Sequence, residues 1–355
     1  MGRAYATQLA ALFLSIAVFT TGQTFLFVVL PPLGRTLGFA DMQTALILSA
    51  SACVLILAAP VWGFLTERVG RRRVLLVSLT GATLAAAGFA VAVHLRLAQA
   101  IDVGPSLALI AAIRMFQVCL ACGILPAAQA LIADTTSPDE RARGMGVFGG
   151  AIGVGGIVGS VLAWRLAGQN TVAAFTVIAA LALIALMAAF SCVRDRRNVD
   201  AAAERNVRLR IGPILPYLAI TLIAIASFSM IQQVIALRVQ DTLDFSVADS
   251  ISRVGAMLMA TMAMLVLVQL GAVRLLHWSP SRLLAVGTSV AFVSLLAATA
   301  VSGFPALFAA IALLGIGLGL MLPGNVALVS LKADAGTQGK AAGANLVAQG
   351  LGQAL

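Results

Sequence analysis

The residue best placed to do chemistry is Arg114, which lies deep inside an apolar run at residues 105–132. It is about nine residues into the run, or roughly 13 Å at 1.5 Å per residue. A charge at that depth costs about 2.5 kcal/mol or more unless it faces a cavity or a partner. Gln117 follows three residues later, so the two side chains share one helix face. The pair predicts a polar site that binds solute or serves ion coupling; an arginine that extends to the membrane surface is the structural alternative.

Four more polar residues inside apolar runs are candidates for the same cavity: Gln23, Gln232, Gln233 and Asn325. Each amide could contact a solute or simply bind another helix. Gln232 and Gln233 are about 100° apart around a helix, so at most one of them points squarely inward.

Acidic residues avoid the apolar runs, because none of the 13 Asp and Glu residues falls inside one. Embedded carboxylates often carry the proton in transporters. Proton coupling would therefore need Arg114 to act on an unrecognised site, or an acid at the membrane edge such as Asp134. The sequence has no H-E-x-x-H pattern, and the pair Cys119 and Cys122 lacks a second pair of ligands. We expect no enzyme activity, no cofactor and no metal site.

The elements that carry these residues are apolar runs long enough to cross a bilayer, about 20 residues each. Of the 355 residues, 61% are hydrophobic and only 10% charged, so we expect an all-α integral membrane protein. The runs lie at 7–31, 43–64, 74–95, 105–132, 145–164, 172–192, 212–236, 254–273, 283–302 and 305–329, with an eleventh from about Gly339. Basic residues concentrate in alternate connections, which places the N-terminus in the cytoplasm and disfavours nucleic-acid binding.

The two halves of the chain repeat each other at an offset of 197 residues, which aligns Pro126 with Pro323. Three glycines of the first half, 146, 153 and 155, then coincide with glycines 343, 350 and 352. The predicted domains are a six-helix bundle at 1–192, a basic cytoplasmic linker at 193–211 and a second bundle at 212–355. The repeat predicts twelve helices in the full protein, with this chain ending inside the eleventh.

The loop between the second and third runs reads GFLTERVGRRR from Gly63 to Arg73. It resembles the signature loop of the major facilitator superfamily, with Glu67 in place of the usual Asp. The resemblance implies two pseudo-symmetric six-helix bundles with the solute site between them near the bilayer midplane. It also implies a cytoplasmic gate, in which Gly63 permits close approach of another helix and Gly70 permits a turn. The gate residues are Gly63, Glu67, Arg68, Gly70, Arg71 and Arg72, with Asp134 as a partner for Arg68 or Arg71.

Two further patterns resemble the drug:proton antiporter branch of that superfamily, which includes multidrug and tetracycline exporters. Arg114-x-x-Gln117 resembles the start of its fourth-helix motif, although Val118 replaces the expected Gly. Gly146, Gly155 and Gly159 resemble its fifth-helix glycine motif, although Ser160 stands where that motif has Pro. Small residues for tight helix packing are the structural explanation of the same glycines.

Taken together, these features predict a secondary active transporter that works by alternating access. The expected activity is export of small amphipathic or drug-like compounds in exchange for protons, by a monomer in the inner membrane of a bacterium. A metabolite importer or facilitator of the same fold is the first alternative, and a membrane receptor or scaffold that does not transport is the second.

Overall fold

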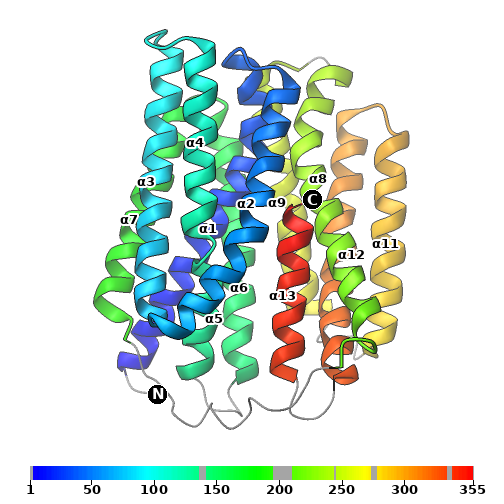
Figure 1. The fold of residues 1–355 in the computed structure, drawn as a ribbon. Coiled ribbons are helices and arrows are strands. Elements are labelled where there is room, and N and C mark those ends of the chain that lie inside the picture. The colour runs from blue at the N-terminus through cyan, green and yellow to red at the C-terminus, as the bar shows by residue number, and fades with distance from the viewer. Residues whose placement is uncertain are drawn as a thin grey trace. The chain divides into compact units, whose positions relative to one another are not determined.

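The computed structural model describes residues 3–135, 141–194, 210–243, 245–272, 278–333 and 338–354, apart from some side chains within these ranges. This part of the chain consists of twelve α-helices and two π-helical turns, without strands (Figure 1). Ten of its helical segments are long and apolar enough to cross a membrane. The prediction of an all-α membrane protein is confirmed, since backbone groups in a bilayer must find their partners within helices.

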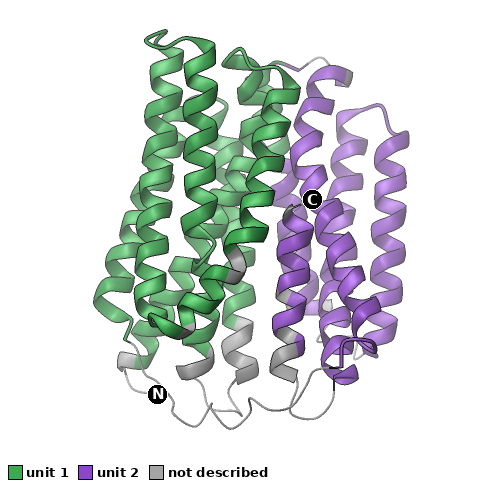
Figure 2. Ribbon diagram, in the orientation of Figure 1, with its two compact units in different colours: residues 1–198, 246–255 green, residues 199–245, 256–355 purple. Residues whose placement is uncertain are grey.

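The chain divides into two compact units, coloured separately in Figure 2. Unit 1 comprises residues 1–198 and 246–255, and unit 2 comprises residues 199–245 and 256–355. The helices of unit 1 are α1 (Arg3–Thr36), α2 (Asp41–Arg68), α3 (Arg71–Leu97), α4 (Val103–Ala121), α5 (Ile124–Thr135), α6 (Arg141–Leu162), the π-turn η2 (Ala163–Ala167) and α7 (Thr171–Cys192).

Unit 2 begins with α8 (Leu215–Leu243), and α9 (Val247–Leu267) starts in unit 1 and continues into unit 2. The remaining elements are the π-turn η4 (Val268–Ala272), α11 (Pro280–Ala300), α12 (Phe304–Lys332) and α13 (Gln338–Ala354). The core of unit 1 is a large apolar cluster that includes Leu12, Ile16, Leu75, Leu79 and Ile124. A smaller cluster in unit 2 centres on Leu314, Leu318 and Met321 of α12.

The apolar run at 105–132, expected as one helix, is interrupted between α4 and α5. Pro126 has no N–H to donate to the carbonyl of residue 122, which removes one helical hydrogen bond at this point. The indole Nε1 of Trp62 donates to the Cys119 carbonyl at 2.6 Å. Gly123 lies against the same indole, where an added Cβ would be 2.9 Å from the Trp62 ring. Close packing against Trp62 and the missing proline donor together account for the break.

Two helix ends extend beyond the apolar runs that predicted them. α9 begins at Val247, seven residues earlier than expected, because Ser246 caps it by accepting a hydrogen bond from the Asp249 N–H at 3.1 Å. α8 continues to Leu243, and Arg238 in its last turns donates to the carbonyls of Ala298 and Val301 at the end of α11. Such polar terminal turns lie outside the apolar runs, so hydropathy alone does not predict them.

Glycines set the closest helix contacts in both units. A Cβ at Gly155 of α6 would collide with the Ala17 carbonyl of α1, and one at Gly159 would lie 2.6 Å from the Thr21 carbonyl. In unit 2, a Cβ at Gly352 of α13 would lie 2.6 Å from the Leu222 carbonyl of α8. Association of helices in lipid depends on such close backbone approach, so these glycines are required by the packing itself.

We expect Gly155→Ala to lower the midpoint of thermal unfolding, because the added methyl group must displace the α1 backbone, at a cost of about 1–3 kcal/mol. Gly150→Ala is the matched control on the same helix, since its Cβ would meet nothing within 4 Å among the described residues. Thermal unfolding of both variants in detergent tests this. Equal midpoints for the two would show that the contact of α6 with α1 is looser than described.

Candidate functional site

A polar cluster inside unit 1 is built around Arg114 of α4, whose side chain is only 3% exposed. Its Nη1 donates to Gln23 Oε1 of α1 at 2.9 Å and to Gln117 Oε1 at 2.7 Å. Its Nε donates to Ser51 Oγ of α2 at 3.2 Å. The structure therefore brings Arg114 together with Gln117 and Gln23, whose roles stay predictions, and the guanidinium turns inward rather than toward the membrane surface.

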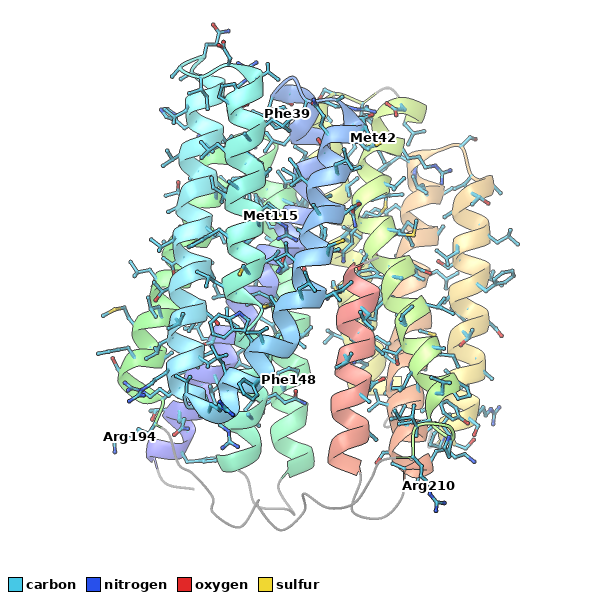
Figure 3. All side chains as sticks on the ribbon, viewed as in Figure 1. Phe39, Met42, Met115, Phe148, Arg194 and Arg210 are labelled. Atoms are coloured by element: carbon cyan, nitrogen blue, oxygen red, sulfur yellow. The ribbon has the colours of Figure 1, made fainter. Side chains whose placement is uncertain are left out.

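Helix geometry explains how these groups meet. Gln117 lies one turn from Arg114 on α4, and Phe27 lies one turn from Gln23 on α1. The Phe27 ring centroid is 5.5 Å from the Arg114 guanidinium carbon, within the range of a cation–π contact. Figure 3 labels Met115, the next residue on α4. Three helices thus supply the surroundings of one charge.

Ser51 and Phe27 were not predicted from the sequence. Ser51 also donates to the Leu48 carbonyl of its own helix at 2.7 Å, as serines in helices commonly do. Nothing in the sequence distinguishes this serine from others on apolar runs. Its placement beside Arg114 depends on how α2 packs against α4, which only the tertiary structure reveals.

The partners of Arg114 are all neutral, and Arg114 makes no ion pair among the described residues. The three acids of unit 1 whose side chains are described lie at helix ends: Asp41 begins α2, Asp102 precedes the first residue of α4, and Asp249 lies in the first turn of α9. Asp41 is bound to Arg35 through a two-point contact at 2.8 and 2.7 Å. The guanidinium charge inside unit 1 therefore remains without a counter-charge in the described part of the unit.

Unit 2 contains a neutral polar cluster instead. Asn325 of α12, 1% exposed, donates through Nδ2 to the Tyr217 carbonyl at 2.8 Å and to Thr221 Oγ1 at 2.7 Å, both on α8. Thr221 in turn donates to Asn345 Oδ1 of α13 at 2.7 Å. For Asn325, the structure favours the alternative that it binds another helix. Thr221 and Asn345 were missed, because single polar residues at these positions carry no pattern.

The same positions in unit 1 are apolar. At the offset of 197 residues, Asn325 corresponds to Ala128 and Asn345 to Phe148, and both of these are buried in the core cluster. Phe148 is labelled on α6 in Figure 3. The fold therefore does not require amides at these places. Of the remaining candidates in α8, Gln232 is buried and Gln233 half-buried, and their roles stay predictions.

The predicted gate lies where α2 ends and α3 begins. Gly70 adopts φ +106°, which confirms the turn expected there and favours glycine. The guanidinium of Arg68 lies over the Phe64 ring, 4.4 Å from its centroid, and Arg72 Nη2 donates to the Phe190 carbonyl of α7 at 2.8 Å. The side chains of Glu67 and Asp134 lie outside the described residues, so the expected pairing of Asp134 with Arg68 or Arg71 stays a prediction.

A shallow cavity of about 430 Å³ opens beside these arginines. Its lining residues are Arg72, Arg73, Phe190, Ser191, Val193 and Arg194, the last of which is labelled in Figure 3. The expectation that Gly63 permits a close approach of another helix stays a prediction. Within 4 Å of a Cβ built there, no atom of the described chain is found.

The sequence as a whole matches a known family. The model of the Major Facilitator Superfamily aligns with residues 12–355. The chain belongs to the major facilitator superfamily. It is accordingly a multi-pass membrane protein with a transporter fold, which implies a small-molecule substrate and a membrane environment.

Curated relatives of this superfamily member include human solute carrier family 67 member A1, 30% identical over 190 residues, and mouse solute carrier family 22 member 18, 31% identical over 172 residues. The first match covers 53% of this chain and 40% of the relative; the second covers 47% and 39%. The chain thus matches about two fifths of the length of each relative.

Solved structures share the fold at low sequence identity. A bacterial homologue of the human lysosomal transporter Spinster superposes with a TM-score of 0.75 at 15% identity, covering 100% of this chain and 81% of that chain. The human organic anion transporter MFSD10 gives 0.70 at 18%, covering 100% and 92%. A D-xylose-proton symporter gives 0.72 at 14%, covering 99% and 87%. These likenesses confirm the superfamily fold and do not distinguish its branches.

The glycines of α6 have a structural explanation in this superfamily member. Gly155 and Gly159 contact the α1 backbone directly, while the surroundings of Gly146 lie outside the described residues. Their part in antiport stays a prediction, because tight packing alone accounts for the two that the structure places.

We expect Thr221→Val to lower the thermal midpoint, because it leaves Asn325 and Asn345 each short of one hydrogen bond inside the helix bundle, at about 1–3 kcal/mol for each buried group. Thr299→Val is the control, since Thr299 is exposed on α11 and bonds only the Leu296 carbonyl of its own helix. Thermal unfolding in detergent compares the two. A midpoint for Thr221→Val within one degree or so of the control would contradict the role of this cluster.

Proposed function

We propose that this protein is a secondary active transporter that exports small amphipathic compounds in exchange for protons by alternating access. The observation that carries the proposal is the buried guanidinium of Arg114, held by side chains from three helices of unit 1. A charge in such a place is costly, and charges inside membrane domains usually mark the path of a substrate or ion. The superfamily fold supplies the general mechanism.

The apolar character of the spans supports an amphipathic substrate. A solute that meets mostly aliphatic and aromatic side chains gains affinity by burying apolar surface, while a few polar groups orient it. In this proposal Arg114, Gln117 and Gln23 of unit 1 supply the polar contacts. Asn325 has an indirect role in this proposal, because it holds α8 against α12.

Proton coupling requires a group that takes up and releases the proton. In the described part of unit 1, the groups bonded to Arg114 are amides and a hydroxyl, which do not titrate near neutral pH. The candidate carrier is Asp134 in the last turn of α5, at the membrane edge. With Glu67, Arg68, Arg71 and Arg72, the same acid would form a cytoplasmic gate that closes in one access state and opens in the other.

Import or facilitated passage of a metabolite is the second candidate, favoured by the absence of a carboxylate beside Arg114 among the described residues. Among similar structures, the D-xylose-proton symporter shows that this fold also serves symport. The two candidates differ in the direction in which solute moves relative to the proton gradient, which vesicles of known orientation can measure.

We expect Arg114→Ala to abolish solute-driven collapse of a pH gradient imposed on inside-out vesicles that contain the full-length protein, reducing the rate at least tenfold. Arg114→Lys keeps the charge but loses the planar two-nitrogen fork, so it should retain part of the rate. Arg165→Ala is the matched control, because Arg165 is exposed and lies over the Trp164 ring.

A panel of amphipathic compounds added to these vesicles gives the readout, with the wild-type protein as reference. Some compounds should collapse the pH gradient in vesicles with the wild-type protein and with Arg165→Ala, but not in vesicles with Arg114→Ala. This result supports proton-linked export. If folded wild-type protein responds to none of them, the export proposal fails and import or facilitation becomes the leading function.

A further inference from the structure

Some N–H groups of the Arg114 guanidinium have no hydrogen-bond partner among the described residues. A guanidinium has five N–H groups. Ser51 occupies the one on Nε, and Gln23 and Gln117 occupy the two on Nη1. The two on Nη2 have no partner among the described residues. Nη2 is not one of the fully enclosed atoms without a partner, so it keeps some exposure, although Arg114 as a whole is only 3% exposed.

The charge of Arg114 is likewise unbalanced among the described residues. Its three hydrogen-bond partners are two amide oxygens and a hydroxyl, and none carries a negative charge. Asp102 precedes α4 and lies twelve residues back along the chain from Arg114, which is about 18 Å along a helix. At such a separation an acid does not pair with the guanidinium. A buried cation without a counter-charge is strongly unfavourable.

We propose that the counter-charge is the substrate, and that the transported compound carries one anionic group, a carboxylate or sulfonate, which binds Nη2 of Arg114. This rests on the proposed function, since it names the substrate class of the same site. Oxygen anions and guanidinium groups form short, charge-assisted hydrogen bonds. One cation balances one negative charge, so monoanions fit and phosphate dianions do not.

The surroundings of the guanidinium define the rest of the compound. Phe27 is half-buried beside Arg114, with its ring 5.5 Å from the guanidinium carbon. An aromatic or aliphatic body attached to the anionic group would lie against such a ring. The preferred compounds are therefore amphipathic monoanions, and their neutral amides or cationic amines would leave the Arg114 charge unpaired.

Matched sets of compounds test this directly. Benzoate, 2-naphthoate and octanoate are each compared with the corresponding primary amide and amine, by calorimetric titration of the full-length protein in nanodiscs. At least one carboxylate should bind ten times more tightly than its own amide and amine. Equal or weaker binding of every carboxylate overturns the proposal, and this comparison needs no variant.

Variants then assign the preference to Arg114. Arg114→Gln should bring each carboxylate to within about threefold of its amide, whereas Arg114→Lys should keep a reduced preference and Arg165→Gln should behave as wild type. A preference that persists in folded Arg114→Gln also overturns the proposal. If Arg114→Gln does not fold, the reduced preference in Arg114→Lys, set against Arg165→Gln, carries the assignment.

Failure of this inference can be told apart from failure of the proposed function. If amides or amines collapse the pH gradient as strongly as carboxylates do, the proposed export stands and the anionic substrate class is excluded. A carboxylate preference in binding, without any collapse of the gradient, would leave the anion site standing and remove proton-linked export.

Discussion

A positive charge enclosed by membrane helices must be stabilised by what surrounds it, and unit 1 is arranged around that requirement. Arg114 on α4 is held by acceptors from α1, α2 and α4 itself. These contacts satisfy three of its five donors and fix the orientation of the guanidinium, but they do not neutralise it. Neutral partners of this kind leave the charge unneutralised, whereas a protein carboxylate would compete with any anionic ligand.

The two units share their backbone packing and differ in their polar chemistry. Gly155 and Gly352 occupy corresponding places and approach α1 and α8 respectively in the same way. Yet the positions of Asn325 and Asn345 are filled in unit 1 by Ala128 and Phe148. Close helix contact tolerates only the smallest residues, so it preserves glycine, while polar residues at other positions vary between the halves according to their use.

Much of the fold follows from hydropathy and charge, because about 20 apolar residues in a row have few alternatives to a spanning helix. The pairing of Arg114 with Gln117 follows from helical spacing alone. Ser51, Thr221 and Asn345 could not be found in this way, since their partners lie on helices far away in sequence. The break at Cys122–Gly123 was also missed, because it depends on packing against Trp62 from another helix as well as on Pro126.

The packing of α1 connects the glycine motif of α6 to the charged cluster. Thr21 Oγ1 donates to the Gly155 carbonyl at 3.1 Å, and a Cβ at Gly159 would meet Thr24 at 3.1 Å. Gln23, which accepts from Arg114, lies between those two threonines in the chain. The backbone of α6 therefore determines how far α1 can move, and through α1 it determines where the Gln23 amide meets the guanidinium. Glycines that serve packing can in this way position a charge on a helix that they do not touch.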